Sequence, residues 1–268
     1  MSKVRVCVIG AAGRMGRRLV ALIMESNDLE LSGAIEAAGN PLLGSDAGSV
    51  AGVAAANVQI SDDLDAALAN SDAVINFSTA GVVDATRKCL ANNCSCVIGT
   101  TALNDAEKAE LAAMAKVGKI VFAPNYSVGV NLLFHLSGMV AKLLSDYDVE
   151  IVEMHHNQKK DAPSGTAERL GEVVAAAREQ LYKEVVKHGR EGVVGARTAR
   201  EIGMHAVRGG DVVGDHTVIF ATGGERVELT HKASSRDTFA KGALRAVRFL
   251  QTASAGRLYD MQDVLGLR

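Results

Sequence analysis

Tryptophan is absent from this 268-residue sequence, and aromatic residues make up only 4% of it. Because large rings are scarce, the hydrophobic cores must be built mainly from Val, Ile, Leu, Ala and Met. The hydrophobic content of 48% is ordinary for a globular protein. Strong charge is also lacking: the net charge of −2 offers no positive field to attract nucleic acid or an anionic membrane. The length fits one large domain or two modest ones.

Paired cysteines and long apolar runs are missing as well. Four cysteines occur, none in a C-x-x-C pair, and we expect small buried hydrophobes in a reducing compartment rather than disulfides or metal ligands. The most apolar later run, residues 128–144, contains Asn131, His135 and Lys142 and predicts a core helix rather than a membrane span. Glycines break the N-terminal run too early for a signal peptide. We expect a soluble, cytoplasmic protein.

Strand-like and helix-like segments alternate through the first half of the chain. β-Branched apolar runs predict strands at residues 3–10, 29–36, 72–77, 94–100 and 119–124. Helical spacing of apolar residues predicts helices at residues 14–26, 63–70, 81–93 and 104–118, the last with Asn104 as N-cap. Such alternation is typical of βαβ units. We therefore predict an α/β fold with a Rossmann-like, doubly wound parallel sheet and helices on both faces.

The pattern changes after Pro124. The following segments predict a helix at about 129–144, a half-exposed strand at 146–156, a helix from Thr166 to about Lys183 and a long loop near 188–204. Three strand-like runs then follow without intervening helices, and an amphipathic helix begins near Ser235. We predict a dinucleotide-binding domain at residues 1–126, completed by 235–268. A second α+β domain with an open mixed sheet is predicted at 127–234.

A glycine-rich loop separates the first predicted strand from the first predicted helix. Gly10, Gly13 and Gly16 have the spacing GxxGxxG rather than the usual GxGxxG, with Ala11 and Ala12 inside. Such a loop lets backbone N–H groups approach a pyrophosphate at a helix N-terminus. The alternative is a glycine turn that serves only tight packing.

An acidic residue is expected about 20 residues after such a loop, where it holds the adenosine ribose. Glu36 ends the second predicted strand and fits this position. Ala37 follows it, so no adjacent cation is present to bind a 2′-phosphate, which favours NADH over NADPH. Arg14 and Arg17 weaken that inference, because either is placed to reach a phosphate.

Two further loops follow predicted strands at the presumed ligand edge of the sheet, where doubly wound folds bind their ligands. Ordinary loop composition is the alternative explanation. The loops consist of Gly99, Thr100 and Thr101, and of Ala123, Pro124, Asn125, Tyr126 and Ser127.

The segment E-M-H-H-N-Q-K-K-D-A-P-S-G-T, residues 153–166, carries most of the ionisable chemistry. His155 and His156 face opposite sides of an extended segment unless the strand has already ended. The remaining histidines are scattered, without the spacing of common zinc sites, so we expect no metal. A histidine exchanges protons near neutral pH, and Lys159 is suited to protonate a carbanion-like centre or to attract an anion.

The end of this segment predicts a helix start. Ser164, Gly165 and Thr166 would present backbone N–H groups that suit a carboxylate. Together with the preceding cations, they indicate a small acidic substrate that receives a hydride and a proton. A solvated polar loop ahead of a capped helix is the alternative.

At these residues the sequence resembles the 4-hydroxy-tetrahydrodipicolinate reductase family, also called dihydrodipicolinate reductase. The segment E-M-H-H-N-Q-K-K-D-A-P-S-G-T-A matches the family signature E-x-H-H-x-x-K-x-D-A-P-S-G-T-A at every defined position. The family motifs G-A-A-G-R-M-G, A-P-N-Y-S-V-G-V-N, R-G-G-D-V-V-G-D-H-T-V and E-R-V-E-L-T-H-K-A-S-S-R match in order. The resemblance therefore covers essentially the whole chain.

The resemblance implies an oxidoreductase that uses NAD(P)H to reduce a dicarboxylate cyclic imine to tetrahydrodipicolinate in lysine and diaminopimelate biosynthesis. His155 matches the acid/base residue, Lys159 the proton donor and His156 a substrate contact, while Gly165 with Thr166 matches the carboxylate-binding pair. Family members are typically homotetramers assembled through the sheet of the second domain. The cofactor-binding positions that carry over are Gly10, Ala11, Ala12, Gly13, Arg14, Met15, Gly16, Glu36, Gly99, Thr100, Thr101, Ala123, Pro124, Asn125 and Tyr126.

Two positions depart from the family pattern. Many relatives carry Arg where Ala37 stands, and some carry Arg where Thr79 stands. Both changes remove positive charge from the adenosine end, so we predict NADH as the preferred cofactor with NADPH tolerated.

Two other classes of protein are the alternatives to this family. A dehydrogenase acting on homoserine or aspartate would not need the His-His-x-x-Lys segment. A non-catalytic dinucleotide sensor would usually carry a basic DNA-binding segment, and the sequence shows none.

Overall fold

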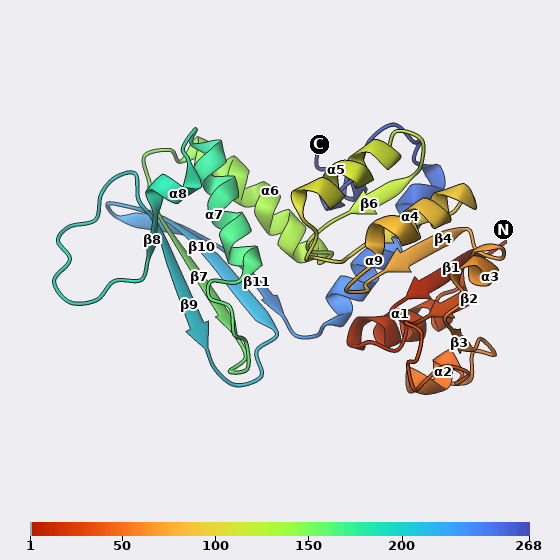
Figure 1. Cartoon of the computed structure of the whole chain (residues 1–268). Coiled ribbons are helices and arrows are strands. Elements are labelled where there is room, and N and C mark those ends of the chain that lie inside the picture. Colours follow the sequence, from red (N-terminus) through yellow and green to blue (C-terminus); the bar gives the residue numbers. More distant parts are fainter. Residues whose placement is uncertain (1) are drawn as a thin grey trace. The chain divides into compact units, whose positions relative to one another are not determined.

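A computed structural model describes residues 2–268 of the chain, which divides into two compact units (Figure 1). Unit 1 consists of Met1–Val128 together with Asp237–Arg268, and unit 2 consists of Gly129–Arg236. Unit 1 is therefore built from both ends of the chain, with unit 2 inserted between them in sequence.

Six parallel strands form the sheet of unit 1, in the order β3-β2-β1-β4-β5-β6. They are β1 (Val4–Ile9), β2 (Leu29–Ile35), β3 (Ile60–Ser61), β4 (Ala73–Asn76), β5 (Ser95–Ile98) and β6 (Ile120–Phe122). The strand order reverses between β1 and β4. In doubly wound sheets, ligands bind outside the carboxyl ends of the strands at such a point. The predicted Rossmann-like parallel sheet is confirmed.

Helices cover both faces of this sheet. They are α1 (Arg14–Met24), α2 (Ala47–Val50), α3 (Leu64–Leu68), α4 (Val82–Ala91), α5 (Asp105–Met114), α9 (Asp237–Thr252) and α10 (Met261–Val264). Helices α1 and α9 share one core with Val8 and Ile75, whereas α3, α4 and α5 share the other with Cys7 and Val74. Adjacent strand residues face opposite sides, so strands buried on both faces appear in the sequence as continuous apolar runs.

Local sequence signals set the helix ends. Asn104 accepts a hydrogen bond from the Glu107 backbone N–H at 2.9 Å, and the Glu107 side chain accepts one from the Asn104 N–H at 2.8 Å. This reciprocal capping box satisfies two backbone donors at the start of α5. The predicted N-cap at Asn104 is therefore confirmed.

Unit 2 contains a five-stranded mixed sheet in the order β11-β10-β7-β9-β8. Its strands are β7 (Asp148–His155), β8 (Val186–His188), β9 (Ile202–Arg208), β10 (Gly214–Thr222) and β11 (Glu225–Ala233). Strands β7, β9 and β8 run parallel, while β10 is antiparallel to both β7 and β11. The predicted open mixed sheet is confirmed.

Three helices complete unit 2: α6 (Val128–Leu143), α7 (Gly165–Ala177) and α8 (Tyr182–Val185). Helices α6 and α7 pack on one face of the sheet, around buried residues such as Ile151 and Leu170. Burial alternates along β7, which places Glu153 and His155 on the same face as Ile151. The apolar core thus gives way to ionisable side chains at the carboxyl end of β7.

Two predictions for unit 2 were wrong in extent. The helix predicted from Thr166 to about Lys183 ends at Ala177, and Glu179 follows with a left-handed φ of 56°, which a helix does not accommodate. The loop predicted near 188–204 is shorter, because β8 includes His188 and β9 begins at Ile202. β8 has only three residues, and β9 contains one glycine and is followed by another. Both features hide the alternation of apolar and polar residues in the sequence.

The four cysteines are free and buried, as predicted. Burial raises the pKa of the Cys94 thiol to about 11, so this group is a poor nucleophile near neutral pH. Among residues 2–268, no helix combines the length and apolarity that crossing a membrane requires.

Candidate active site

The glycine loop of unit 1 is a tight turn between β1 and α1. Gly10 has a left-handed φ of 82°, a conformation that favours glycine. A Cβ on Gly16 would lie 2.0 Å from the Gly10 carbonyl oxygen, and one on Gly13 would lie 3.2 Å from it. The spacing GxxGxxG is thus a packing requirement. The N–H groups of residues 10–13 donate hydrogen bonds within the protein, so a phosphate would be held by the first N–H groups of α1. This cradle fits a dinucleotide pyrophosphate.

Glu36 lies directly against this loop. Its Oε1 accepts a hydrogen bond from the Ala12 backbone N–H at 2.8 Å, and Asn40 Nδ2 donates to its Oε2 at 3.3 Å. Arg17 is turned back onto the same loop, since its Nε donates to the Ala12 carbonyl at 2.8 Å. The structure therefore brings the predicted phosphate loop and the predicted ribose-binding carboxylate together.

The other two predicted cofactor loops meet around Tyr126. Its hydroxyl donates to the carbonyl of Ile98 at 2.9 Å and approaches that of Val121 at 3.2 Å, and its side chain is buried. A Cβ on Gly99 would lie 2.3 Å from the Phe77 ring, so this glycine allows the ring to pack there. Tyr126 therefore serves to hold the two loops rather than to present its hydroxyl.

The remaining residues of these loops differ in exposure. Thr100 is buried and its Oγ1 donates to the Ser78 carbonyl at 2.6 Å, whereas Thr101 and Pro124 are exposed. Ala123 is buried and Asn125 is half-buried. Residues with exposed surface are the ones able to contact a ligand, and the buried ones shape the loops.

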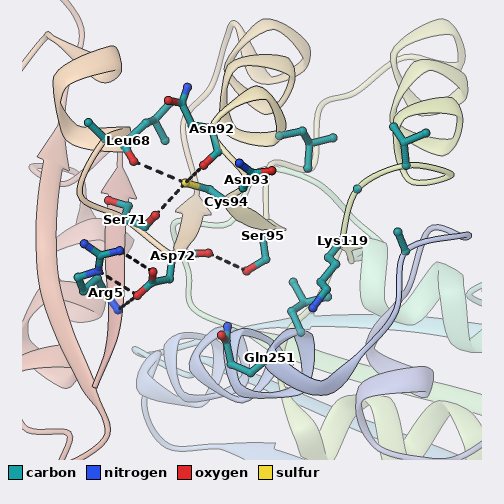
Figure 2. Close-up of a pocket in the computed structure, with 16 residues that line it drawn as sticks. Arg5, Leu68, Ser71, Asp72, Asn92, Asn93, Cys94, Ser95, Lys119 and Gln251 are labelled. Atoms are coloured by element: carbon teal, nitrogen blue, oxygen red, sulfur yellow. Dashed lines mark hydrogen bonds and ion pairs between the residues drawn. The ribbon is translucent and has the colours of Figure 1, made fainter. Parts of the chain in front are cut away.

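A cavity of about 590 Å³ opens at the opposite, amino-terminal edge of the same sheet (Figure 2). Arg5 Nη2 donates to Asp72 Oδ1 at 2.7 Å, and this pairing holds the pKa of the Asp72 carboxyl below its usual range. Lys119 and Gln251 reach the cavity from the start of β6 and from α9 (Figure 2). None of the described residues predicted for the site lines it, so the candidate site lies elsewhere.

In unit 2 the site is centred on a buried carboxylate, Glu153, whose exposed fraction is 0%. Its Oε1 accepts hydrogen bonds from Arg208 Nη2 at 2.8 Å and from the Ser164 N–H at 3.0 Å. Its Oε2 accepts from Arg208 Nη1 at 2.8 Å and bonds His155 Nδ1 at 2.6 Å. Glu153 thus connects three separate segments: the end of β7, the start of α7 and the end of β9.

The charge state of Glu153 follows from this geometry. Burial by itself raises the pKa of a carboxyl group, but the hydrogen bonds from Arg208 and His155 outweigh burial and bring the pKa of Glu153 below its usual value. The side chain is therefore an ionised carboxylate that acts only as an acceptor.

His216 on β10 closes the other side of the cluster. Its ring meets the His155 ring edge to face, with centroids 5.2 Å apart, and its Nε2 lies 3.1 Å from Ser164 Oγ. Burial and the neighbouring His155 lower the pKa of His216 to about 3, so this ring is neutral at physiological pH. Its Nδ1 is buried without a hydrogen-bond partner in the described structure.

The predicted proton donor lies on the loop after β7. Lys159 Nζ donates to both carboxylate oxygens of Asp161, at 2.9 and 2.8 Å, and this contact lowers the pKa of Asp161. Arg208 Nη2 also donates to the Asp161 backbone carbonyl at 2.7 Å. The arginine that holds Glu153 therefore also holds the loop that carries Lys159.

The predicted carboxylate-binding turn begins α7. Ser164 is the N-cap, and its Oγ accepts from the Ala167 N–H at 3.2 Å. A Cβ on Gly165 would meet no atom within 4 Å, so packing does not require glycine at this position. The open space at the helix N-terminus is suited to an anion.

The two adjacent histidines differ in their surroundings. His155 is the last residue of β7, and His156 follows the strand end, where its N–H donates to the Val212 carbonyl at 2.8 Å. His155 is buried, whereas His156 is half-exposed. Among the described residues, no group of three or more His, Cys, Asp or Glu side chains is arranged to hold a metal.

Three residues of this cluster received no role in the sequence analysis: Glu153, Arg208 and His216. Each lies inside a motif that was used for the resemblance, so the signal was present. That these three residues lie together in one cluster follows only from strand pairing, since β7 lies between β9 and β10. Glu153 and Arg208 are 55 positions apart, and the sequence pattern hides such a contact.

A class of protein follows from the two units. A nucleotide-type sheet with a glycine loop, linked to an α+β unit that carries acid/base side chains, is typical of two-domain, dinucleotide-dependent oxidoreductases.

Comparison with known proteins identifies the family. Residues 4–126 match the family model described as "Dihydrodipicolinate reductase, N-terminus", and residues 129–265 match "Dihydrodipicolinate reductase, C-terminus". The 4-hydroxy-tetrahydrodipicolinate reductase of Nitrosomonas europaea is 52% identical, with 100% of both chains covered. That of Geotalea daltonii is 50% identical, over 99% of this chain and 100% of the relative.

A solved structure agrees over nearly the full length. The dipicolinate-bound dihydrodipicolinate reductase from Paenisporosarcina sp. TG-14 aligns with a TM-score of 0.77 at 27% identity and covers 97% of this chain and 98% of its own. The chain belongs to the dihydrodipicolinate reductase family, whose members are NAD(P)-binding oxidoreductases.

Proposed function

We propose that the protein catalyses the NAD(P)H-dependent reduction of 4-hydroxy-tetrahydrodipicolinate to tetrahydrodipicolinate, a step of lysine and diaminopimelate biosynthesis. The observation that carries this proposal is the cluster at the end of β7, where Glu153 bonds both His155 and the N-terminus of α7. Matches to curated reductases over 99% and more of the chain support the same substrate.

Unit 1 is proposed as the cofactor domain. The glycine loop at Gly10–Gly16 would hold the pyrophosphate against the first N–H groups of α1, and Glu36 would hold the adenosine ribose. The two loops around Tyr126 would line the nicotinamide end. When bound, the reduced nicotinamide supplies the hydride. The fit of the loop to a pyrophosphate supports this assignment.

Unit 2 is proposed as the substrate domain. Gly165 and Thr166 at the start of α7 would bind one carboxylate, and His156 would contact the substrate. Loss of the 4-hydroxyl group as water first gives the conjugated imine, dihydrodipicolinate. Hydride addition to this imine leaves an enamine-type carbanion equivalent, which then needs a proton. We assign Lys159 as the direct donor, with His155 relaying or tuning that transfer. The donor regains its proton from solvent, so each turnover consumes one hydride and one proton.

NADH is proposed as the preferred cofactor, with NADPH tolerated. The residue after Glu36 is Ala37, which offers no cation for a 2′-phosphate, and Thr79 is uncharged. Arg17 bonds the Ala12 carbonyl instead of projecting from the loop. These contacts support the preference.

A cytoplasmic homotetramer, assembled through the sheet of unit 2, is part of the proposal. Val207 and Val227 on this sheet are 41% and 38% exposed, so their apolar side chains are available for contact with another copy of the chain. Light scattering is expected to give about four times the mass of one chain. A monomeric mass under assay conditions would contradict the assembly.

The function is tested by following loss of reduced-nicotinamide absorbance with substrate made from pyruvate and aspartate semialdehyde by the upstream synthase. NADH and NADPH are run in parallel. Turnover with either cofactor supports the reaction. Measurable NADH binding without turnover would point to a sensor or to another substrate.

A further inference from the structure

The tautomer of His155 is fixed by its neighbour. Glu153 is an ionised carboxylate that only accepts hydrogen bonds, and its Oε2 lies 2.6 Å from His155 Nδ1. The proton on a neutral His155 must therefore be on Nδ1. The opposite nitrogen, Nε2, then carries the lone pair.

The rest of the His155 ring is enclosed on two more sides. The His216 ring packs against it in a T-shaped contact, and backbone at Gly214 lies beside Nε2, where a Cβ would be 3.0 Å from that nitrogen. No hydrogen-bond partner of Nε2 is present among residues 2–268. The ring is thus held in one orientation with one nitrogen left for exchange.

Arg208 extends the same arrangement to Lys159. It forks onto both oxygens of Glu153 and also donates to the carbonyl of Asp161, whose side chain pairs with Lys159. A planar fork fixes a carboxylate in position and direction, which a single bond does not. One ion pair, between Glu153 and Arg208, therefore fixes the position of His155 and of the loop that carries Lys159.

We propose that Glu153, clamped by Arg208, is a positioning residue that keeps His155 in the Nδ1–H tautomer and leaves Nε2 as the nitrogen that takes up and returns the proton. The inference rests on the proposed function and assigns a role to two residues outside the catalytic pair. A histidine that presents the wrong nitrogen loses acid/base catalysis even when substrate still binds.

Glu153→Gln tests the inference, with Glu150→Gln as matched control. Glu150 lies on the same strand and also bonds arginine and histidine side chains, Arg190 and His205, but on the other face of the sheet. We expect Glu153→Gln to lower kcat roughly 10²-fold with less than about a threefold change in KM. Glu150→Gln is expected to keep kcat within about twofold of wild type.

A direct readout of the tautomer is independent of turnover. Ring ¹⁵N chemical shifts of labelled histidine, with His155 assigned by its absence in His155→Gln, distinguish Nδ1–H from Nε2–H. Wild type is expected to show Nδ1–H, and Glu153→Gln a mixture or Nε2–H. Glu153→Asp, which keeps the charge, is expected to recover part of kcat together with the Nδ1–H signal.

The outcomes distinguish failure of the positioning role from failure of the proposed function. An Nε2–H signal in wild type, or equal losses of kcat in Glu153→Gln and Glu150→Gln, would overturn the positioning role. If Glu153→Gln does not fold, Arg208→Lys, which keeps the charge but loses the fork, replaces it with the same expected kcat loss. Absence of turnover in wild type, with Nδ1–H observed, would contradict the proposed function and leave the tautomer assignment intact.

Discussion

In the proposed mechanism, the proton step depends on Lys159 and His155. Both are held in place, Lys159 by Asp161 and His155 by Glu153. Lys159→Met is expected to lower kcat by roughly 10²- to 10³-fold, because the direct proton donor is removed. His155→Ala is expected to lower it by about 10²-fold, at the low end of that range, since the lysine remains. Steady-state kinetics of both variants provide the measurement, and near-normal turnover of Lys159→Met with a larger loss in His155→Ala would exchange the roles.

The proposed cofactor preference also rests on single residues. Ala37→Arg places a cation beside Glu36, where a 2′-phosphate would lie, and one charge-assisted hydrogen bond is worth about 1.4 kcal/mol or more. We therefore expect the ratio of kcat/KM for NADPH over NADH to rise by about tenfold. Ala37→Gln is the uncharged control. A wild-type enzyme that already prefers NADPH at equal concentrations would contradict the basis of this prediction.

Among the helices and strands, the N-terminus of α7 is the element proposed to bind a substrate carboxylate. Gly165→Ala adds a methyl group into open space, so the melting temperature should stay within about 2 °C of wild type. KM for the substrate should rise severalfold, because the methyl group crowds the proposed carboxylate site. Gly16→Ala is the contrasting variant, as its Cβ would lie 2.0 Å from the Gly10 carbonyl and should destabilise unit 1. An unchanged KM in Gly165→Ala would remove this turn from the substrate site.

Most elements were predictable because their signals are local. The strands of unit 1 are apolar runs between glycine and polar turns, and the start of α5 is marked by Asn104 and Glu107. Two short elements were not predicted. β3 has two residues and α2 has four, which is too few for a hydrophobic periodicity to show in the sequence. The end of α7 was missed because the residue with left-handed backbone after it is Glu179. The sequence signals such a position only when it is occupied by glycine or asparagine.

The candidate site was predictable only in part. The His-His-x-x-Lys segment and the helix start are contiguous, so their chemistry is visible in one stretch of sequence. The partnership of Glu153 with Arg208 depends on β9 lying beside β7, which results from tertiary pairing. Likewise, the sequence did not show that Tyr126 is buried or that its hydroxyl bonds the Ile98 carbonyl.

At the scale of the whole molecule, stability should depend on pH through His216. Burial and His155 lower its folded pKa to about 3, whereas an unfolded histidine titrates near 6.5. The unfolded chain therefore binds the extra proton first as pH falls. The contribution of the neutral His216 to the free energy of unfolding is fully present above about pH 6.5. It is lost between about pH 6.5 and about pH 3, by at most about 1.4 kcal/mol per pH unit.

Melting temperatures between about pH 7 and pH 5 test this, because carboxylates titrate mostly below that range. Wild type is expected to lose stability as pH falls, and His216→Gln to show a flatter profile. His231 on the neighbouring strand, whose pKa is also lowered by burial, should leave a residual slope. Parallel profiles for wild type and His216→Gln would show that His216 is not the group responsible.

Isotope placement in the product reports on both the hydride transfer and the protonation of the proposed reaction. The upstream synthase reaction is coupled to this enzyme in ordinary water with reduced nicotinamide deuterated at the transferred position, and the ring product is analysed by mass spectrometry and NMR. We expect one deuterium per ring, at the carbon that accepts the hydride, with ordinary hydrogen at the carbon protonated afterwards. A product without deuterium, or no reduced ring at all while the cofactor binds, would contradict the proposed reaction.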